Sequence, residues 1–212
     1  MFKKKENPML IGYYKPSVIL TYLGVISATI GIYFAINGRI DISLICLIVS
    51  GVCDAFDGKV ARACKRSSDE KAFGIQLDSL ADMVSFIFLP IMICYGLGLM
   101  KWYNIVIYAI YTLGGIIRLA YFNVKAECCE GPVSYYSGLP VTSVSIIFPI
   151  TFIISYFTSR PEFNVLYTLV MLFTAILFVL NFKIKKPSGK LIYIFVVFAL
   201  IISAIIFMLS VR

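Results

Sequence analysis

Residues 54–82 read DAFDGKVARACKRSSDEKAFGIQLDSLAD and span the junction between two long apolar runs, 40–62 and 74–98. A run of about 20 apolar residues can cross a bilayer core as a helix. Near this junction each run carries two acidic side chains, and each of these costs at least ~2.5 kcal/mol at the centre of a lipid-facing helix. We therefore expect four aspartates to face a bundle interior or a water-filled cavity: Asp54, Asp57, Asp78 and Asp82.

Five further apolar segments of similar length accompany this pair. Hydrophobic residues make up 60% of the 212 residues and charged residues only 14%, which argues against a water-soluble globule and against a disordered chain. The runs are too long and too continuous for the alternating strands of a β-barrel. The sequence predicts an all-α, polytopic membrane helix bundle with seven spans: 17–36, 40–62, 74–98, 103–124, 139–158, 163–182 and 191–210.

The distribution of lysine and arginine predicts how the bundle is oriented. If the N-terminus is cytoplasmic, fifteen of the 19 basic residues fall at cytoplasmic ends. Residues 1–15 then form a cytoplasmic tail or an interfacial helix, and the basic segment between Arg62 and Gly74 is a cytoplasmic turn. We find no cleavable signal peptide. We expect residues 1–212 to form one integral domain of a plasma membrane, with the segment 126–138 as a cytoplasmic loop.

Two composition features limit the chemistry. The chain has no histidine, which excludes histidine zinc sites and Ser-His-Asp triads. Its cysteines show no zinc-like spacing, and we interpret all six as free thiols: Cys46, Cys53, Cys64, Cys94, Cys128 and Cys129.

The spacing of the aspartates predicts that they meet. They are three residues apart in the first run and four in the second, so each pair shares one face of its helix. A short turn makes the two helices antiparallel, and the carboxylates then converge at one depth, where they repel unless protons or cations neutralise them. Oxygen ligands without histidine or thiolate suit Mg²⁺, Mn²⁺ or Ca²⁺, and two such ions form a clamp for phosphoryl chemistry. The alternative is a proton relay or an ion pathway.

Small and basic residues lie beside the aspartates. Gly58, Ala61 and Gly74 allow a flat ligand or another helix to approach the backbone, and helix packing is the commoner use of such residues in membranes. Lys59 and Arg62 can contact phosphate, the arginine through a two-point fork.

Together these positions resemble the signature of the CDP-alcohol phosphatidyltransferases: Asp54-x-x-Asp57-Gly58-x-x-Ala61-Arg62 followed by Gly74-x-x-x-Asp78-x-x-x-Asp82. The resemblance implies a dimeric membrane enzyme with a six-helix core, here with about one extra C-terminal span. It also implies that a CDP-linked lipid and two divalent cations, Mg²⁺ or Mn²⁺ with Ca²⁺ as a substitute, bind at the cytoplasmic ends of the helices.

The resemblance also assigns roles to residues. It implies that Asp54, Asp57 and Asp78 are ligands of the metal ions and that Asp82 completes the metal site. It makes Asp82 the general base as well. The CDP-lipid is expected to contact Asp54, Gly58, Ala61, Arg62 and Gly74, with Lys59 added for its charge.

Three weaker local patterns concern the alcohol that accepts the phosphatidyl group. The segment from Phe73 to Phe86, the run Arg118-Leu119-Ala120-x-Phe122-Asn123, and Gly138-Leu139-Pro140 with Thr142 resemble the members of the family that use L-serine. They imply transfer of a phosphatidyl group from CDP-diacylglycerol to L-serine, giving phosphatidylserine and CMP. Arg118 is predicted at the level of the aspartates, where it can bind the serine carboxylate, bind a lipid phosphate, or anchor the helix.

Two other functions stay open at this point. One is a synthase of the same family that uses glycerol 3-phosphate or an inositol phosphate, acceptors whose phosphate needs a denser basic pocket. The other is a cation transporter that uses the aspartates. As partners we expect membrane lipids and a second copy of the chain, and no nucleic acid.

Overall fold

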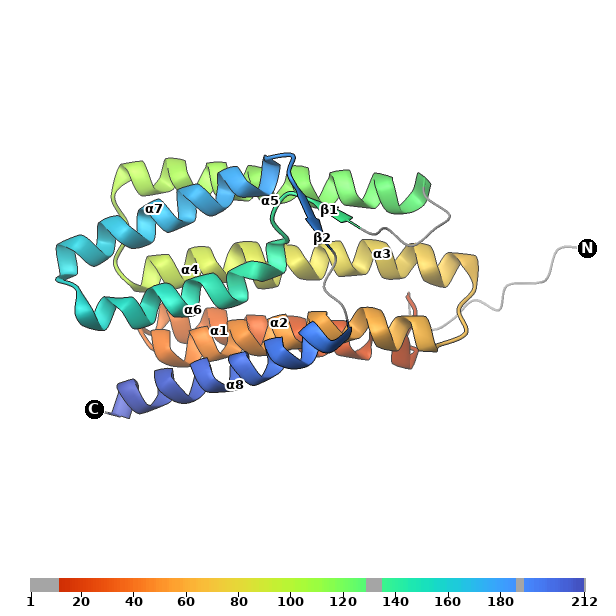
Figure 1. Ribbon diagram of the computed structural model, residues 1–212, viewed down its shortest axis with the longest axis horizontal. Coiled ribbons are helices and arrows are strands. Elements are labelled where there is room, and N and C mark those ends of the chain that lie inside the picture. The colour runs from red at the N-terminus through yellow and green to blue at the C-terminus, as the bar shows by residue number, and fades with distance from the viewer. Residues whose placement is uncertain (1–11, 129–134, 186–188, 212) are drawn as a thin grey trace, which may run out of the picture.

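The computed structural model describes residues 12–128, 135–185 and 189–211, and Figure 1 traces them along the chain. The first helices are α1 (Pro16–Ile36), α2 (Ile40–Ala63) and a continuous rod made of α3 (Ser68–Asp82), the π-helix η1 (Met83–Phe88) and α4 (Leu89–Gly96). The later helices are α5 (Trp102–Cys128), α6 (Val144–Ile154) between the 3₁₀ turns η2 (Val141–Ser143) and η3 (Ser155–Phe157), α7 (Arg160–Val179) and α8 (Gly189–Val211). Each of the seven predicted spans is thus largely helical within these residues.

The predicted all-α, multi-pass membrane bundle is confirmed. Five helical segments of the described chain are long and apolar enough to cross a membrane: Pro16–Ile36, Ser68–Gly96, Trp102–Lys125, Arg160–Val179 and Tyr193–Ser210. The acid-bearing α2 packs against α1, α4, α6 and α8. Other helices therefore surround the span that carries Asp54 and Asp57, as the cost of exposing carboxylates to lipid requires.

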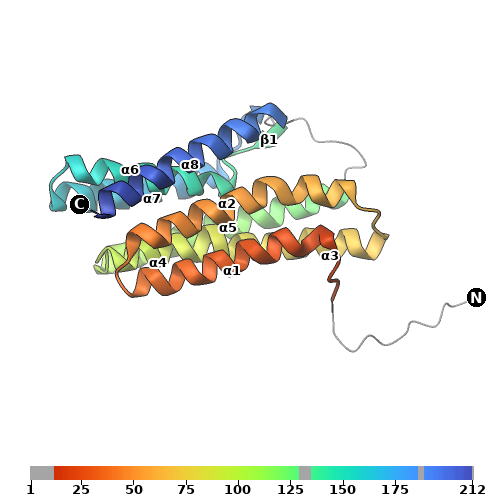
Figure 2. The same ribbon diagram turned by 90° about the horizontal axis from the view of Figure 1, so that it is seen from below.

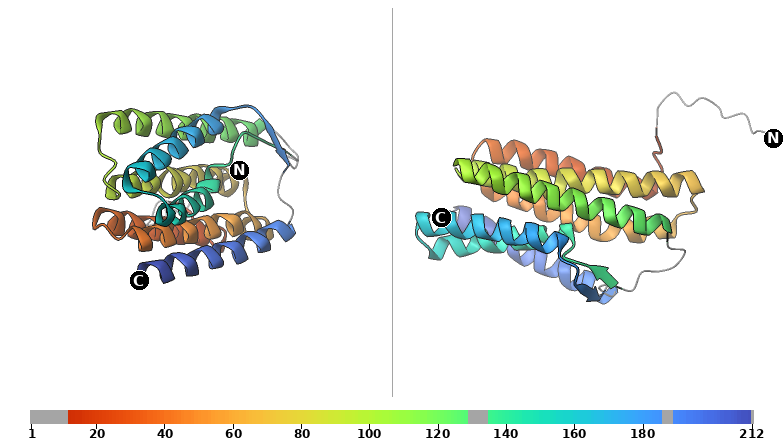
Figure 3. Two further views of the ribbon diagram at one scale, coloured as in Figure 1. Left: turned by 60° about the vertical axis from the view of Figure 1, so that its left-hand side comes forward. Right: turned by 90° about the horizontal axis from the view of Figure 1, so that it is seen from above.

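The helices form two layers. Figure 2 shows α6, α7 and α8 lying on one face of the group made by α1 to α5. Figure 3 shows the start of α1 and the turn between α2 and α3 at one end of the bundle, with the end of α8 at the other. Within the first layer, α1 lies tight on α2: a Cβ atom at Gly31 would stand 2.9 Å from the Cβ of Cys46, so this contact requires glycine.

The turn between α2 and α3 is shorter than predicted. The hydropathy of the sequence predicts that the third span begins at Gly74, but α3 begins six residues earlier, at Ser68. Ser67 caps this helix: its side chain accepts from the backbone N–H of Glu70 at 3.2 Å, and the Glu70 carboxylate accepts from the Ser67 N–H at 3.0 Å. This reciprocal capping box stabilises an extra polar first turn that hydropathy alone does not detect.

The segment 126–138 is also not a plain loop. Helix α5 continues to Cys128, and the strand β1 (Tyr135–Ser137) pairs antiparallel with β2 (Lys183–Lys185). Gly138 follows β1 with φ +71° and donates its N–H to the carbonyl of Phe182 at 2.7 Å. Strands of three residues are too short to give a periodic signal, so the sequence analysis missed this ribbon.

Parts of three predictions lie outside the described residues. These are most of the segment 1–15, residues 129–134 of the predicted loop 126–138, and the side chains of Cys128 and Cys129. The other four cysteines are free thiols, as predicted: Cys46, Cys53, Cys64 and Cys94.

A buried aromatic group holds the rod against α5 and the second layer. Tyr111 on α5 is fully buried and donates its hydroxyl to the carbonyl of Phe86, inside the π-helix, at 2.7 Å. Its ring lies 5.4 Å from that of Phe178 and 6.2 Å from that of Phe148, centroid to centroid. A side-chain donor here satisfies a carbonyl where the α-helical hydrogen-bond ladder is interrupted.

We predict that Tyr111→Phe lowers the free energy of unfolding by about 1 kcal/mol, because it leaves the Phe86 carbonyl without this donor. The measurement is unfolding of the purified protein in mild detergent, followed by circular dichroism. Tyr103→Phe is the matched control, since Tyr103 is 40% exposed. Equal stabilities for the two variants would contradict the role given to the Tyr111 hydroxyl.

Candidate functional site

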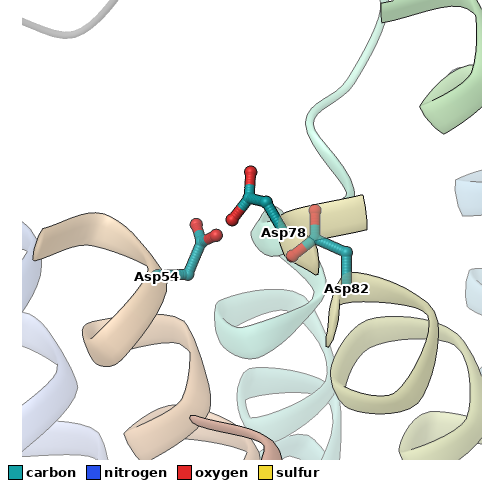
Figure 4. A group of neighbouring side chains, drawn as sticks. All are labelled: Asp54, Asp78 and Asp82. Carbon is teal, nitrogen blue, oxygen red and sulfur yellow. The ribbon is translucent and has the colours of Figure 1, made fainter. Parts of the chain in front are cut away.

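The acidic side chains of α2 and α3 converge near the N-terminal end of the bundle. Figure 4 shows Asp54 from α2 pointing toward Asp78 and Asp82 from α3. One carboxylate oxygen of each residue lies within 4.8 Å of the corresponding oxygens of the other two. Asp82 is buried, at 8% exposure. The i, i+4 spacing on α3 therefore presents both of its acids to α2.

Asp57 completes this group from the next turn of α2. It is buried, and one of its oxygens accepts a hydrogen bond from the hydroxyl of Thr21 on α1 at 3.2 Å. Asp57 also lies within hydrogen-bonding contact of Asp78, and Asp54 of Asp82. The structure thus brings all four predicted carboxylates together, in two contacting pairs that bridge the two helices.

This donor set fits divalent cations that prefer oxygen. Carboxylates in contact repel unless a proton or a cation lies between them. Ligand oxygens on opposite sides of one ion, each 2.0–2.6 Å from it, stand roughly 4–5 Å apart, and the 4.8 Å limit on the separations within the aspartate cluster agrees with that range. Asp54, Asp78 and Asp82 are therefore the residues best placed to hold an ion, with Asp57 beside them.

A cavity of about 180 Å³ opens beside the aspartates, between α1, α2 and α3. We call it the glycine pocket, because Gly58 and Gly74 line it together with Ala61 and Arg62. Asp57 and Asp78 line it as well, so four of the six predicted CDP-lipid residues share one space with two of the acids. Asp54, which was also expected to contact the CDP-lipid, does not line this cavity.

Lys59 is the predicted CDP-lipid residue that the structure turns elsewhere. Its ammonium group lies 5.3 Å from the ring centre of Phe56 and 4.9 Å from that of Tyr193 on α8. Lys59 is not among the residues that line the glycine pocket. This geometry makes it a contact between α2 and α8.

A second cavity, of about 210 Å³, lies on the other side of the aspartates, and we call it the Arg118 pocket. Three aspartates of α2 and α3 line this cavity: Asp54, Asp78 and Asp82. Arg118 of α5 lines it as well. Arg118 is 6% exposed, and its guanidinium lies 4.6 Å from the ring centre of Phe122. Arg118 thus lies at the level of the aspartates, as predicted from the sequence.

Polar contacts between helices fix the width of the Arg118 pocket. Ser79 on α3 donates its hydroxyl to the side-chain oxygen of Asn123 on α5 at 2.7 Å, and both residues line the pocket. The Asn123 amide in turn lies 3.4 Å from the side-chain oxygen of Gln76. These contacts hold the arginine wall opposite the aspartate wall.

Sequence reasoning missed two residues of the site. Thr21 is one of several hydroxyl residues in the apolar run 17–36, and its position facing Asp57 depends on how α1 packs on α2. Arg66 lines the glycine pocket, but the sequence analysis used it only as a positive charge in the orientation argument. Its proximity to Gly74 arises from the short turn between α2 and α3, which was predicted to be longer.

Comparison with known proteins agrees with this geometry. The family model for CDP-alcohol phosphatidyltransferases matches residues 16–211. A CDP-diacylglycerol–serine O-phosphatidyltransferase of Saccharomyces cerevisiae is 37% identical over 107 residues, which are 47% of this chain and 38% of the yeast protein. An archaetidylserine synthase of Methanothermobacter thermautotrophicus is 24% identical over 172 residues, 81% of this chain and 70% of that protein.

A third relative, the CDP-diacylglycerol–serine O-phosphatidyltransferase of Helicobacter pylori, is 30% identical over 129 residues, 59% of this chain and 50% of that protein. The chain thus matches half or less of the yeast and Helicobacter relatives and a larger share of the archaeal one. Since the family model extends from the first residue of α1 to the last of α8, the chain belongs to the CDP-alcohol phosphatidyltransferase family.

Proposed function

We propose that the chain transfers a phosphatidyl group from CDP-diacylglycerol to L-serine and releases phosphatidylserine and CMP. Family membership supports a CDP-alcohol as the donor. The names of the yeast and Helicobacter relatives refer to serine, and that of the archaeal relative to archaetidylserine. Membership of this family favours an enzyme over the cation transporter that the aspartates alone left open.

The charge pattern of the Arg118 pocket is the observation that carries serine as acceptor. Among the described residues that line it, Arg118 is the single cation, and it faces three carboxylates. A zwitterionic amino acid offers a carboxylate to Arg118 and an ammonium group to the acidic side. Glycerol 3-phosphate or an inositol phosphate brings a dianion to this acidic cavity, which one arginine offsets poorly.

The aspartates hold the reacting groups in this proposal. Asp54, Asp57 and Asp78, with Asp82, hold two divalent cations, Mg²⁺ or Mn²⁺, with Ca²⁺ as a substitute. Such ions supply neutralisation of the diphosphate and stabilisation of the charge that develops on CMP. Arg62 contacts the diphosphate with its two-point fork, and the backbone at the two glycines gives the nucleotide close access to the helices.

Asp82 lies on the side of the aspartate cluster where the proposal places the acceptor. It lines the Arg118 pocket and contacts Asp54. The hydroxyl oxygen of serine attacks the β-phosphorus while the carboxylate of Asp82 accepts its proton. The bond between the β-phosphorus and the bridging oxygen breaks, and CMP leaves with the electron pair of that bond. One phosphodiester bond forms as one diphosphate bond is lost.

We further propose that residues 1–212 act as one catalytic domain in a plasma membrane, as a homodimer among membrane lipids. The N-terminus and the aspartates lie at the cytoplasmic face in this proposal. The basic residues gathered around the turn between α2 and α3 support this orientation: Lys15, Arg62, Lys65, Arg66 and Lys71.

The first prediction concerns the acceptor and the metal. Purified protein given CDP-diacylglycerol, Mn²⁺ or Mg²⁺ and labelled L-serine is expected to release CMP in proportion to serine incorporated into lipid. Excess EDTA is expected to abolish both products, because it removes the cations that neutralise the negative charge of the diphosphate beside the aspartates. CMP release that needs glycerol 3-phosphate or an inositol phosphate instead of serine would reassign the acceptor.

The second prediction concerns Asp82. Asp82→Asn removes the proton acceptor and is expected to lower kcat by at least about 100-fold. The matched control is Asp41→Asn, the same change at the opposite end of α2, where Asp41 pairs with Arg39 at 3.1 Å. The control should keep near-normal turnover. Turnover by Asp82→Asn at the rate of the control would refute the role of Asp82 as base.

The third prediction concerns Arg118. Arg118→Ala is expected to raise the KM for serine by roughly 10- to 100-fold, because a charge-assisted hydrogen bond is lost, and to change the KM for CDP-diacylglycerol much less. Arg118→Lys, which keeps the charge but not the fork, is expected to fall between the two. The opposite order of KM changes would assign Arg118 to the lipid phosphate.

A further inference from the structure

Arg66 has a polar atom that the protein itself does not satisfy. Its Nε atom is buried and has no hydrogen-bond partner among the described residues. A buried N–H without a partner costs about 1–3 kcal/mol, so native proteins rarely leave one unless a ligand, ion or water meets it. Arg66 comes from the short turn between α2 and α3, and it lines the glycine pocket.

The guanidinium of Arg66 lies against the glycine of α3. A Cβ atom at Gly74 would stand 3.4 Å from Nη1 of Arg66, and a Cβ at Gly58 would stand 3.4 Å from Nη1 of Arg62. The two arginines therefore occupy equivalent positions, each against one glycine of the same cavity. Two guanidinium groups that line one small cavity repel each other, and an anion bound between them removes that repulsion.

The acid of the same turn that the charge of Arg66 reaches is already engaged. Glu70 is close enough for the charge of Arg66 to act on it. Its carboxylate, however, accepts from Nζ of Lys15 at 2.6 Å and from the backbone N–H of Ser67 at 3.0 Å. The other acids of the cavity are Asp57 and Asp78, which contact each other. Lys15 thus holds Glu70 in an ion pair and leaves Arg66 directed to the cavity.

We propose that Arg66 is a second phosphate-binding arginine, which binds the α-phosphate of the CDP-linked lipid, the group that leaves as CMP. The inference rests on the proposed function, whose reaction takes place at the β-phosphorus beside Asp82. Gly74 lies one helical turn, about 6 Å, before Asp78 on α3, so Arg66 meets the part of the nucleotide beyond the β-phosphate. The motif that defines the family contains Arg62 and not Arg66.

The test is binding of labelled CMP to the full-length protein in detergent with Mg²⁺ present and serine absent. Arg66→Ala is expected to raise the Kd for CMP by roughly tenfold or more, because the charge-assisted hydrogen bonds are lost. The matched control is Lys65→Ala, which removes the same charge from an exposed neighbour in the same turn. The control is expected to stay within about twofold of the unsubstituted protein, as a solvated surface charge should.

A second variant separates binding from folding. Arg66→Lys keeps the positive charge but loses the fork, and it is expected to bind CMP with a Kd between those of the unsubstituted protein and Arg66→Ala. Thermal unfolding of all variants is measured beside binding. A Kd for Arg66→Lys and Arg66→Ala within twofold of the unsubstituted protein would overturn the proposal, and so would an equal loss in Lys65→Ala.

These outcomes are distinct from failure of the serine assignment. If the protein does not use serine but Arg66→Ala still weakens CMP binding selectively, the acceptor is wrong and the role of Arg66 stands. If the unsubstituted protein does not bind CMP at all, the role of Arg66 is refuted.

Discussion

The structure depends on the cost of placing four carboxylates among apolar helices. Lipid cannot solvate them and they repel one another, so the bundle must surround them and a counter-charge must join them. Helix α2 accordingly lies among α1, α4, α6 and α8, and α3 faces it with its own acidic pair. The charge that makes these residues expensive to bury is also what suits them to the cations of the proposed reaction.

The two cavities beside this cluster divide the chemistry in space. The glycine pocket has arginines over glycine backbone, a surface suited to a flat base and its phosphates. The Arg118 pocket has one cation opposite three acids, a surface suited to a small zwitterion. Asp78 lines both cavities. Donor and acceptor can therefore approach the cluster from opposite sides and meet at the same carboxylates.

The apolar runs of the sequence predicted the helices, and the spacing of the aspartates predicted that they meet. Both predictions succeeded because they depend only on residues that are close in the sequence and on the free-energy cost of exposing a carboxylate to lipid. The start of α3 was not predicted, since its first turn is polar and is held by the Ser67–Glu70 capping box. The ribbon of β1 and β2 joins residues 135–137 to 183–185, a pairing that no local pattern encodes. Lys59 was expected in the glycine pocket on its charge alone, but its direction depends on the ring of Tyr193 on α8.

The π-helix between α3 and α4 requires a fixed number of residues, whereas the identity of its side chains is less restricted. Each residue of an α-helix turns the chain by about 100°, so deleting one residue between Met83 and Phe88 would rotate α4 against α3 by that angle. Either Asp78 and Asp82 would swing away from α2, or the buried Leu89 and Ile93 would turn toward lipid. Insertions and deletions here should therefore be far less tolerated among homologues than replacements of one apolar side chain by another.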